Sequence, residues 1–449
     1  MPAAAGPISD SLSFLSRGLR TENTEKSHPM NMHMEPDAVA ASMNPGNRLA
    51  LAIVDPSSAG YFIAKRALER GFMCIAISLS HAAPADIDFS WSRDCLDSNF
   101  DALVALDSYD AIMPGAESGV CLAEELAARL GLAGNDPETT ARRRNKTAMA
   151  QAVAEAGIAV CRQACCRSVS DCMAWAEATG YPVVVKPEAS SGGDLVRVCQ
   201  TRDALSQHAS AILDKPDRYG QNTRSVLIQA FMAGDEYTVD GVVSNQVLTI
   251  FAVGKYRKIN LNGAMVYDKI DFLAPSDPAV DRRMLSYCEA VTRAVGVRVG
   301  PVHIEVMLTA NGPLLVEIAA RAHGGIGASV IDASFVPSFI DAIIDSYIPG
   351  ASAGATGQII RKKTSSIAFL ISDRAGTLVA APGIGNIRSL TSFVRLKCFT
   401  APGDAIPKTV DLVTCPALVE LSDDDPGVIE ADIERIRELE RSGAIWEIA

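Results

Sequence analysis

The stretch GPVHIEVMLTANGPLLVEIAARAHGG, at residues 300–325, constrains the fold more strongly than any other part of the chain. From Val302 onward apolar and polar side chains alternate, which predicts a β-strand. An Asn-Gly pair at 311–312 then supplies a turn, because glycine tolerates positive φ angles, and a second apolar run follows. We therefore expect a β-hairpin with Glu305 on its first strand and Glu317 on its second.

The register of this hairpin decides whether its two carboxylates meet. A two-residue loop at 311–312 would leave Glu305 and Glu317 on opposite faces, whereas a three-residue loop at 310–312 would place them directly across from each other. Facing carboxylates repel unless a cation lies between them, and such hard oxygen ligands suit Mg²⁺ bound to nucleotide phosphates. Arg321 follows the second strand, where its planar guanidinium could hold a carboxylate or a phosphate. The alternative is a surface hairpin with two solvated glutamates.

The composition excludes several classes of protein. A chain of 449 residues is too long for one compact core, so about two to four domains are expected. The formal net charge of −12 argues against a nucleic-acid partner, and phosphate groups must therefore be bound by a local basic pocket. No apolar run approaches the roughly 18 residues that span a bilayer, so no membrane partner is expected. The 11 cysteines include no CxxC pair, which favours reduced thiols and a cytoplasmic location.

The first part of the chain is predicted to be an extension followed by an α/β domain. Residues 1–48 have no sustained periodicity, and their apolar core at 12–15 is too short for a secretory signal, so we expect a mobile extension. Residues 49–137 repeat a pattern of buried strand, turn and helix, which implies a parallel sheet. The turn DPSSAG at 55–60 lacks the GxGxxG pattern, and a dinucleotide site is therefore disfavoured.

Residues 138–224 contain a predicted helix that ends at Gly157 and a strand–loop–strand unit at 182–198. The loop offers backbone N–H groups and hydroxyls that suit phosphate oxygens, although such tips are also common for geometric reasons alone. Its four small residues are Ser190, Ser191, Gly192 and Gly193. Lys186 lies inside the first, apolar strand, where an unpaired ammonium would be unfavourable, so an anionic partner is expected.

The remaining residues precede and follow the hairpin predicted at 300–325. Residues 225–275 should form two pairs of strands, and a solvated edge strand is the simplest explanation for their basic residues. These residues are Lys255, Arg257, Lys258 and Lys269. Asp277 is expected to cap the next helix, and 330–347 should form another. From residue 351 onward the pattern is strand-rich, a charged helix at 428–442 closes the chain, and no chemical constellation stands out.

Taken together, these pieces resemble the ATP-grasp superfamily over roughly residues 49–350, and they look most like the L-amino acid ligases that make dipeptides. The resemblance rests on an ordered set of motifs: Lys146 in RRRNKTAM, Lys186 in VVVKPEASSGG, Gln229 to Glu236 in LIQAFMAGDEY, Glu305 in VHIE, and Glu317 with Arg321 in VEIAAR. It implies an α/β (α+β) class and the ATP-grasp fold. Its expected parts are an N-terminal parallel-sheet pre-ATP-grasp domain (49–137), a lid subdomain (138–224), an antiparallel-sheet ATP-binding core with the Mg and substrate site (225–350), and a C-terminal β-rich subdomain (351–449).

The resemblance also implies how ATP would be bound. Lys146 and Lys186 would hold the α- and β-phosphates as point charges. The small-residue loop at 190–193 would close over the β- and γ-phosphates and exclude water. Adenine would be read by Gln229 and by the backbone of Ala230, Phe231 and Met232, and the ribose hydroxyls by Glu236.

The same resemblance assigns the residues nearest the reaction. Glu305 and Glu317 would bind Mg²⁺, or Mn²⁺ in its place. Arg321 would stabilise the charge on the transferring phosphoryl group or grip the substrate carboxylate, and Lys186 belongs to the same catalytic group. His303 shares the face of Glu305 and could meet the amine substrate, although a structural histidine fits the sequence equally well.

The implied function is that of an ATP-dependent carboxylate–amine ligase. ATP would convert an amino acid carboxylate into an acyl phosphate, and the amine of a second amino acid would then give an amide or dipeptide, ADP and phosphate. Ala319 stands where D-alanine ligases place an asparagine, which favours the L-amino acid variety. The alternatives are a biotin carboxylase-like enzyme, for which the chain has no Met-Lys-Met biotinylation signal, and a non-catalytic ATP-binding module. The resemblance also allows a homodimer.

Overall fold

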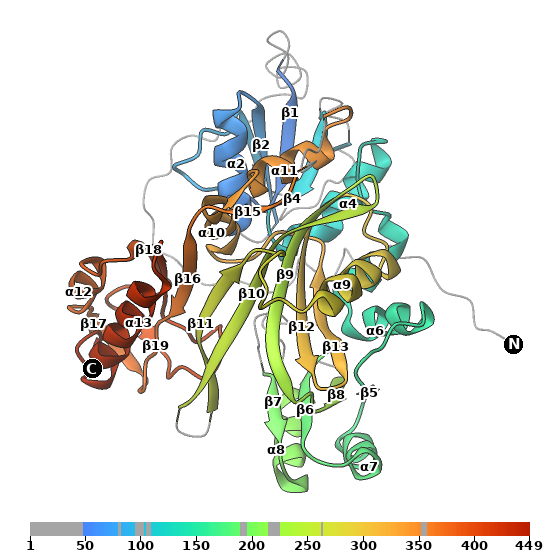
Figure 1. Ribbon diagram of the computed structural model, residues 1–449. Helices are drawn as coiled ribbons and strands as arrows, with labels where there is room; N and C mark the ends of the chain where they lie inside the picture. Colours follow the sequence, from blue (N-terminus) through green and yellow to red (C-terminus); the bar gives the residue numbers. More distant parts are fainter. Residues whose placement is uncertain are drawn as a thin grey trace, which may run out of the picture.

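The computed structural model describes residues 48–79, 82–94, 103–104, 109–188, 195–213, 225–261, 264–351 and 357–449. The expected extension therefore lies outside the described residues, except for residue 48. Among the described residues three sheets have four or more strands, with 4, 8 and 4 strands (Figure 1). In Figure 1 the N-terminal sheet lies at the top, the eight-stranded sheet in the middle and the other four-stranded sheet below it. The expected α/β class, with a parallel N-terminal sheet and a large antiparallel one, is confirmed.

The N-terminal sheet is parallel, and its strands follow the order β3-β2-β1-β4. They are β1 (Ala50–Val54), β2 (Met73–Ser78), β3 (Trp91–Asp94) and β4 (Ala111–Pro114). Every residue of β1 and β2 is buried, as expected for parallel strands that are covered on both faces. Two helices of this unit are α2 (Ala59–Glu69) and α4 (Val120–Arg129), and the short 3-10 turn η2 (Glu117–Gly119) precedes α4.

The second four-stranded sheet is antiparallel and carries Lys186. Its order is β5-β8-β6-β7, formed by β5 (Gln163–Cys166), β8 (Val226–Ala230), β6 (Val183–Pro187) and β7 (Arg197–Cys199). The helices α7 (Val169–Thr179) and α8 (Arg202–Leu213) bury Cys172, Ala176 and Leu205 in a cluster with Val183 and Val185 of β6. Burial of this apolar surface holds the helices on the sheet.

The eight-stranded sheet is antiparallel and contains the hairpin. In sheet order its strands are β13 (Gly312–Ala319), β12 (Gly300–Thr309), β9 (Gly234–Ser244), β10 (Val247–Leu261), β11 (Ala264–Leu273), β16 (Thr364–Phe369), β20 (Ala417–Asp423) and β18 (Phe393–Cys398). Apolar residues of α9 (Arg282–Ala294) share a buried cluster with Val302 and Ile304 of β12. A second cluster joins Ile270 and Phe272 of β11 to α2, α10 (Gly327–Ser334) and α11 (Phe339–Tyr347). The sheet therefore has one face toward the N-terminal unit.

The C-terminal residues extend this sheet through β16, β20 and β18. The other elements there are α12 (Ile384–Arg388), α13 (Pro426–Arg441), and the small sheet of β17 (Gly376–Ala380), β19 (Ala405–Ile406) and β21 (Glu447–Ile448). The expectation of a solvated basic edge strand is wrong, because β10 and β11 lie inside the sheet. Lys269, for example, is buried and forms ion pairs with Glu430 of α13 and, at 2.8 Å, with Asp271.

The expected helix ending at Gly157 is divided in two. Asn145 has an extended backbone (φ −114°, ψ 120°), which ends α5 (Ala141–Arg144) after the 3-10 turn η3 (Pro137–Thr139) and starts α6 (Lys146–Glu155). An asparagine in this conformation is a favoured N-cap, and its side chain competes with helix continuation. The break makes Lys146 the first residue of a new helix.

Two further helix predictions need correction. The helix expected after Asp277 begins at Arg282, because Asp281 accepts a hydrogen bond from the Arg283 N–H at 2.8 Å and caps it. The expected helix at 330–347 is interrupted by β14 (Phe335–Val336), which pairs with β15 (Ile360–Arg361), before α11 begins. The residue before a proline, here Val336, is disfavoured in a helical conformation.

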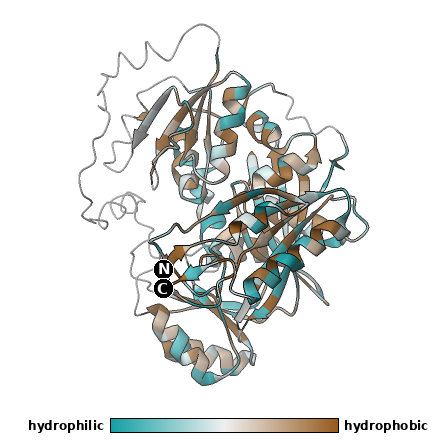
Figure 2. Ribbon diagram, turned by 90° about the vertical axis from the view of Figure 1, so that its left-hand side faces the viewer, coloured by the Kyte–Doolittle hydropathy of each residue, from teal (hydrophilic) through white to brown (hydrophobic). Residues whose placement is uncertain are grey.

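Figure 2 shows that the helices covering the sheets mix hydrophilic and hydrophobic residues, as helices with one buried face do. In the part of the chain that the structure describes, no helix is long and apolar enough to cross a membrane.

Candidate active site

Glu305 and Glu317 lie directly opposite each other on β12 and β13. Of the two registers that the sequence allowed, the one that pairs the two glutamates is observed, but the three-residue loop expected to produce it is not formed. The loop has two residues, Ala310 and Asn311, between the paired Thr309 and Gly312. The alignment comes from a β-bulge, since Val306 pairs with Leu315 and Glu305 with Glu317, which leaves Val316 as an extra residue in β13.

Lys146 reaches this hairpin from the start of α6. The Asn145 side-chain oxygen accepts hydrogen bonds from the N–H groups of Thr147 at 3.0 Å and Ala148 at 2.9 Å, which fixes the first turn of the helix. Lys146 Nζ then lies 3.1 Å from Glu317 Oε2. The helix start therefore holds an ammonium against the second glutamate of the hairpin.

Lys186 reaches the same place from the end of β6, where it is buried. Burial and the positive charge of Lys146 lower the pKa of Lys186 to about 8, while Glu317 and Glu305 act in the opposite direction. These interactions show that the two lysines and the two glutamates lie within electrostatic range of one another. The structure thus brings together four predicted site residues from four different elements.

A carboxylate of the N-terminal unit, that of Glu117, binds the Arg321 side chain. Its Nε donates a hydrogen bond of 2.7 Å to Glu117 Oε2, and the other oxygen of Glu117 is ion-paired with Arg144. Glu117 lies in η2, just beyond the end of β4. A carboxylate between two guanidiniums fixes the direction of the Arg321 side chain.

Three buried side chains, Asp240, His303 and His323, form a hydrogen-bonded cluster. His303 Nδ1 is 2.8 Å from Asp240 Oδ1, and His323 Nδ1 is 2.9 Å from Asp240 Oδ2. Burial lowers the pKa of His303, but the charge of Asp240 outweighs it and the pKa is raised to about 9. His303 is therefore protonated at neutral pH, and its Nε2 lies 3.6 Å from Glu305 Oε1. This position between two carboxylates suits a histidine that orients Glu305.

Glu305 is ionised despite its surroundings. Burial raises the pKa of Glu305, but the hydrogen bond from His303 and the positive charges of His303, Arg321 and Lys146 hold it well below its usual range. The two glutamates supply the hard oxygen ligands that Mg²⁺ takes, and the nearby cations can neutralise phosphate oxygens. The residues present therefore fit a magnesium–nucleotide complex.

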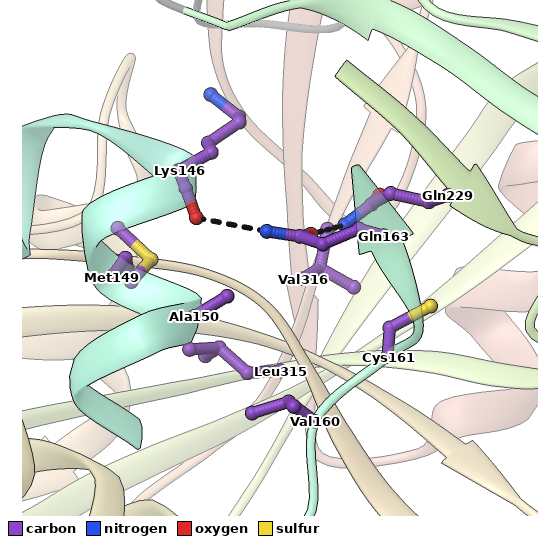
Figure 3. A pocket seen from close by; sticks show the side chains of 9 residues that line it. All are labelled: Lys146, Met149, Ala150, Val160, Cys161, Gln163, Gln229, Leu315 and Val316. Carbon is purple, nitrogen blue, oxygen red and sulfur yellow. Dashed lines mark hydrogen bonds between the residues drawn. The ribbon is translucent and has the colours of Figure 1, made fainter. Parts of the chain in front are cut away.

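A small pocket lies beside Lys146, lined by α6, β5, β8 and β13 (Figure 3). Gln229 donates a hydrogen bond to the side chain of Gln163, which in turn donates to the Lys146 carbonyl at 3.2 Å. The apolar part of the lining consists of Met149, Ala150, Val160, Cys161, Leu315 and Val316. Figure 3 shows the Lys146 ammonium pointing away from these side chains. An apolar lining with a few polar groups is typical of sites for small molecules.

The other residues that were predicted to bind the nucleotide lie in different surroundings. The carboxylate of Glu236 is buried and accepts a hydrogen bond from Tyr267 at 3.0 Å, and it is also ion-paired with Lys258. The Ala230 N–H donates to the Arg162 carbonyl at 2.9 Å, so it already has a partner. Phe231 is 45% exposed and Met232 is half-buried. Ser190, Ser191, Gly192 and Gly193 lie outside the described residues.

Glu117, Gln163, Asp240 and His323 were not predicted as site residues from the sequence. A usable signal existed for Asp240, because it is a carboxylate within the apolar run YTVDGVV and so needed a cationic partner. The same reasoning identified Lys186. No comparable signal marks Glu117 or Gln163, whose partners come from distant segments.

Comparisons with known proteins agree with this geometry. Residues 179–330 match the ATP-grasp domain family. The chain is 28% identical to dapdiamide A synthase from Enterobacter agglomerans over 88% of this chain and 96% of that protein. It is 26% identical to an L-arginine-specific L-amino acid ligase from Bacillus subtilis over 52% of this chain and 56% of that protein. The crystal structure of an L-amino acid ligase from Bacillus licheniformis shares the fold, with a TM-score of 0.73 at 17% identity over 88% of this chain and 98% of that chain.

The match over residues 179–330, together with the fold and the paired glutamates with their lysines, makes the chain similar to ATP-grasp ligases, which form carbon–nitrogen bonds. Among these enzymes it is similar to L-amino acid ligases, as the motifs predicted.

Proposed function

We propose that the protein uses ATP to join two amino acids, or an amino acid and another amine, through an acyl phosphate. The products are an amide or dipeptide, ADP and phosphate. One observation carries the proposal: Lys146 of α6, Lys186 of β6, Glu305 of β12, Glu317 of β13 and Arg321 just after β13 gather at one place. The names of the relatives, a dapdiamide synthase and an L-arginine-specific L-amino acid ligase, support amino acids as the substrate class.

In this proposal the nucleotide lies between the second sheet and the hairpin. Lys146 and Lys186 hold the phosphates, the loop at 190–193 closes over them, and Glu236 exchanges its present partners for the ribose hydroxyls. Adenine occupies the pocket of Figure 3, where Gln229 and the backbone of 230–232 read its edge. Residues 138–224 then act as the lid and 225–350 as the ATP-binding core.

Glu305 and Glu317 would hold Mg²⁺, or Mn²⁺, which would supply charge neutralisation for the transferring phosphoryl group. Arg321, fixed by Glu117, faces the same oxygens or the substrate carboxylate. His303 holds Glu305 in place and is therefore a positioning residue in this scheme. The protein contributes orientation and electrostatics, and the closed lid excludes the water that would hydrolyse the acyl phosphate.

The proposed substrates also indicate the cellular compartment of the enzyme. ATP and free amino acids are cytoplasmic metabolites, and among the described cysteines all ten are free thiols, so we place the enzyme in the cytoplasm.

The test is a screen of phosphate release over pairs of amino acids with ATP and Mg²⁺, followed by the masses of the products. We expect release that requires both substrates, and a product lighter by one water than their sum. Phosphate release that depends on bicarbonate and biotin instead would overturn the proposal in favour of a carboxylase. No release with any pair would leave only a nucleotide-binding protein.

A further inference from the structure

Three consecutive arginines, Arg142, Arg143 and Arg144, form the end of α5. They differ in their surroundings, because Arg142 is exposed, Arg143 is buried and Arg144 is partly buried. An exposed arginine on a short helix needs no special explanation. The other two each bind a carboxylate, Arg143 that of Glu124 and Arg144 that of Glu117.

Arg143 anchors α5 in the fold. Its guanidinium donates hydrogen bonds to Glu124 of α4 at 2.9 Å and 2.8 Å and to the Val295 carbonyl, just after α9, at 3.0 Å. A further hydrogen bond reaches the Asp136 carbonyl at 2.9 Å. These partners come from the N-terminal unit, from the end of α9 and from the start of η3, so they hold α5 from several sides. The position of the last residue of α5, Arg144, is thereby fixed.

Hydrogen bonds and ion pairs place Arg144 at the candidate active site. Its guanidinium is ion-paired with one oxygen of Glu117, and the other oxygen accepts the 2.7 Å hydrogen bond from Arg321 Nε. Two residues along the chain, Lys146 Nζ lies 3.1 Å from Glu317 Oε2. The end of α5 and the start of α6 are therefore both tied to the end of β13, Lys146 directly and Arg144 through Glu117.

The side chains of Arg144, Glu117 and Arg321 form a cluster with one positive charge in excess, because both guanidiniums are paired with one carboxylate. All three are partly accessible, since 29% of the Arg144 side chain, 16% of Glu117 and 17% of Arg321 is exposed. Arg321 Nη1 donates to the Ala322 carbonyl at 2.9 Å, and Nη2 forms no hydrogen bond with any residue that the structure describes. One further anionic group can therefore bind this cluster.

We propose that Arg144 and Arg321, which Glu117 holds side by side, together bind the carboxylate of an amino acid substrate. This inference rests on the proposed function. Arg144 is then a second substrate-binding arginine beside Arg321. The planar N–H groups of a guanidinium match the two oxygens of a carboxylate, whereas the ammonium of a lysine acts as a point charge.

The lysines bind a different group in this scheme. Lys146 is ion-paired with Glu317 of the hairpin, and Lys186 lies within electrostatic range of the same glutamate. The metal and the phosphates would therefore lie on the hairpin side of the site, whereas Glu117 of η2 ties the arginine cluster to the N-terminal unit. A carboxylate bound there keeps the substrate beside the phosphoryl group and does not compete for the lysines.

The experiment uses the amino acid pair found by the phosphate-release screen and three variants of the full chain: Arg144→Gln, Arg144→Lys and the matched control Arg142→Gln. Two assays are run with ATP and Mg²⁺. In the first, hydroxylamine replaces the second amino acid, so hydroxamate formation reports the KM of the first amino acid and of ATP. In the second, amide formation reports the KM of the second amino acid.

We expect Arg144→Gln to raise the KM of an amino acid by about 10-fold to 10²-fold, as loss of a charge-assisted hydrogen bond does, while the KM of ATP stays within about threefold of wild type. Arg144→Lys should recover part of the loss, because it keeps the charge but not the planar fork. Arg142→Gln should match wild type. A rise for the first amino acid assigns the carboxylate that is activated, and a rise for the second alone assigns the carboxylate of the amine-supplying substrate.

Unchanged KM values for both amino acids in Arg144→Gln would overturn the proposal. So would a KM of ATP that rises as much as those of the amino acids, since the arginine would then serve the phosphates, and so would equal losses in Arg142→Gln. If Arg144→Gln does not fold, Arg144→Lys decides: a KM raised by about threefold or more is expected, and an unchanged KM contradicts the proposal. A wild-type enzyme that forms neither hydroxamate nor amide would refute the proposed function itself, and this proposal with it.

Discussion

Lys146 Nζ lies 3.1 Å from Glu317 Oε2, so the first residue of α6 is ion-paired with the hairpin that faces it. Lys146 is buried and the Glu317 side chain is 24% exposed, which leaves the carboxylate within reach of a ligand. A magnesium–nucleotide complex would replace this pair with two new ones, metal to Glu317 and phosphate to Lys146. The ion pair thus holds both groups in place before the nucleotide arrives.

The first prediction concerns this carboxylate. Glu317→Gln keeps the shape of the side chain but removes the charge, so metal-dependent phosphate release and amide formation should fall by about 10²-fold or more. Thermal unfolding should change little. The matched control is Glu155→Gln, on the exposed end of α6, which should keep full activity. Near-normal turnover of Glu317→Gln would contradict the assignment of the metal site.

The second prediction concerns Asn145, which connects the segments that carry Lys146 and Lys186, the two lysines that we propose hold the phosphates. Its oxygen caps the helix that begins with Lys146, and its Nδ2 donates at 3.1 Å to Glu188, two residues after Lys186. Asn145→Ala should lower the free energy of unfolding by about 1 kcal/mol and kcat/KM for ATP by about 10-fold or more, since both lysines shift. Asn145→Ser retains a cap and loses the link to Glu188. It should keep the stability and still lose the affinity for ATP, as measured by initial rates over a range of ATP concentrations.

If Asn145→Ser instead binds ATP as wild type does, the contact with Glu188 is structural only. The unfolding and kinetic measurements on the same pair of variants separate the two roles of this side chain.

The hairpin of β12 and β13 shows which structural features a local sequence pattern can predict. Alternation and an Asn-Gly turn were enough to predict two strands, but they left open whether Glu305 lies opposite Glu317. The bulge at Val316 that produces this pairing was not predictable, because neither the alternation nor the turn residues mark an extra residue in β13. The register that the sequence left open is therefore set by this bulge.

The cluster around Asp240 marks the limit of sequence reasoning. Asp240, His303 and His323 belong to β9, β12 and the loop beyond β13, and only the order of strands in the sheet brings them together. Each residue alone has an ordinary structural explanation. Asn145 is similar, since an asparagine within a helical pattern shows its capping role only once the helix is seen to break there.

The third prediction concerns the contact between α13 and the large sheet. Arg437 is buried and donates hydrogen bonds to Asp268 Oδ1 at 2.6 Å, to the Asp268 carbonyl at 2.7 Å and to the Phe369 carbonyl at 3.0 Å. Arg437→Ala leaves the buried Asp268 carboxylate without this partner and should lower the free energy of unfolding by about 3–5 kcal/mol. Arg441→Ala, on the exposed side of the same helix, should change it by less than about 1 kcal/mol. Chemical unfolding of the full chain is the measurement, and equal effects of the two variants would contradict the expectation.

The fourth prediction uses the titration of Lys186, whose pKa in the free protein is about 8 because of burial and the charge of Lys146. Bound phosphate favours the protonated amine, so above pH 8 the nucleotide must bind together with a proton. The affinity for ATP should therefore fall as the pH rises through about 8, by up to about tenfold per pH unit. For the free energy of unfolding the sign is opposite. Between pH 8 and the ordinary lysine pKa of 10.5 the unfolded chain binds more protons than the folded chain, so this group adds stability as the pH rises.

Lys186→Arg carries a permanent charge and should abolish the pH dependence of nucleotide binding, although its larger head group will weaken binding at every pH. Calorimetric titration with ATP in buffers of different ionisation enthalpy gives the proton uptake directly. Wild-type uptake near zero above pH 8, or an unchanged pH profile in Lys186→Arg, would show that Lys186 does not contact the phosphates.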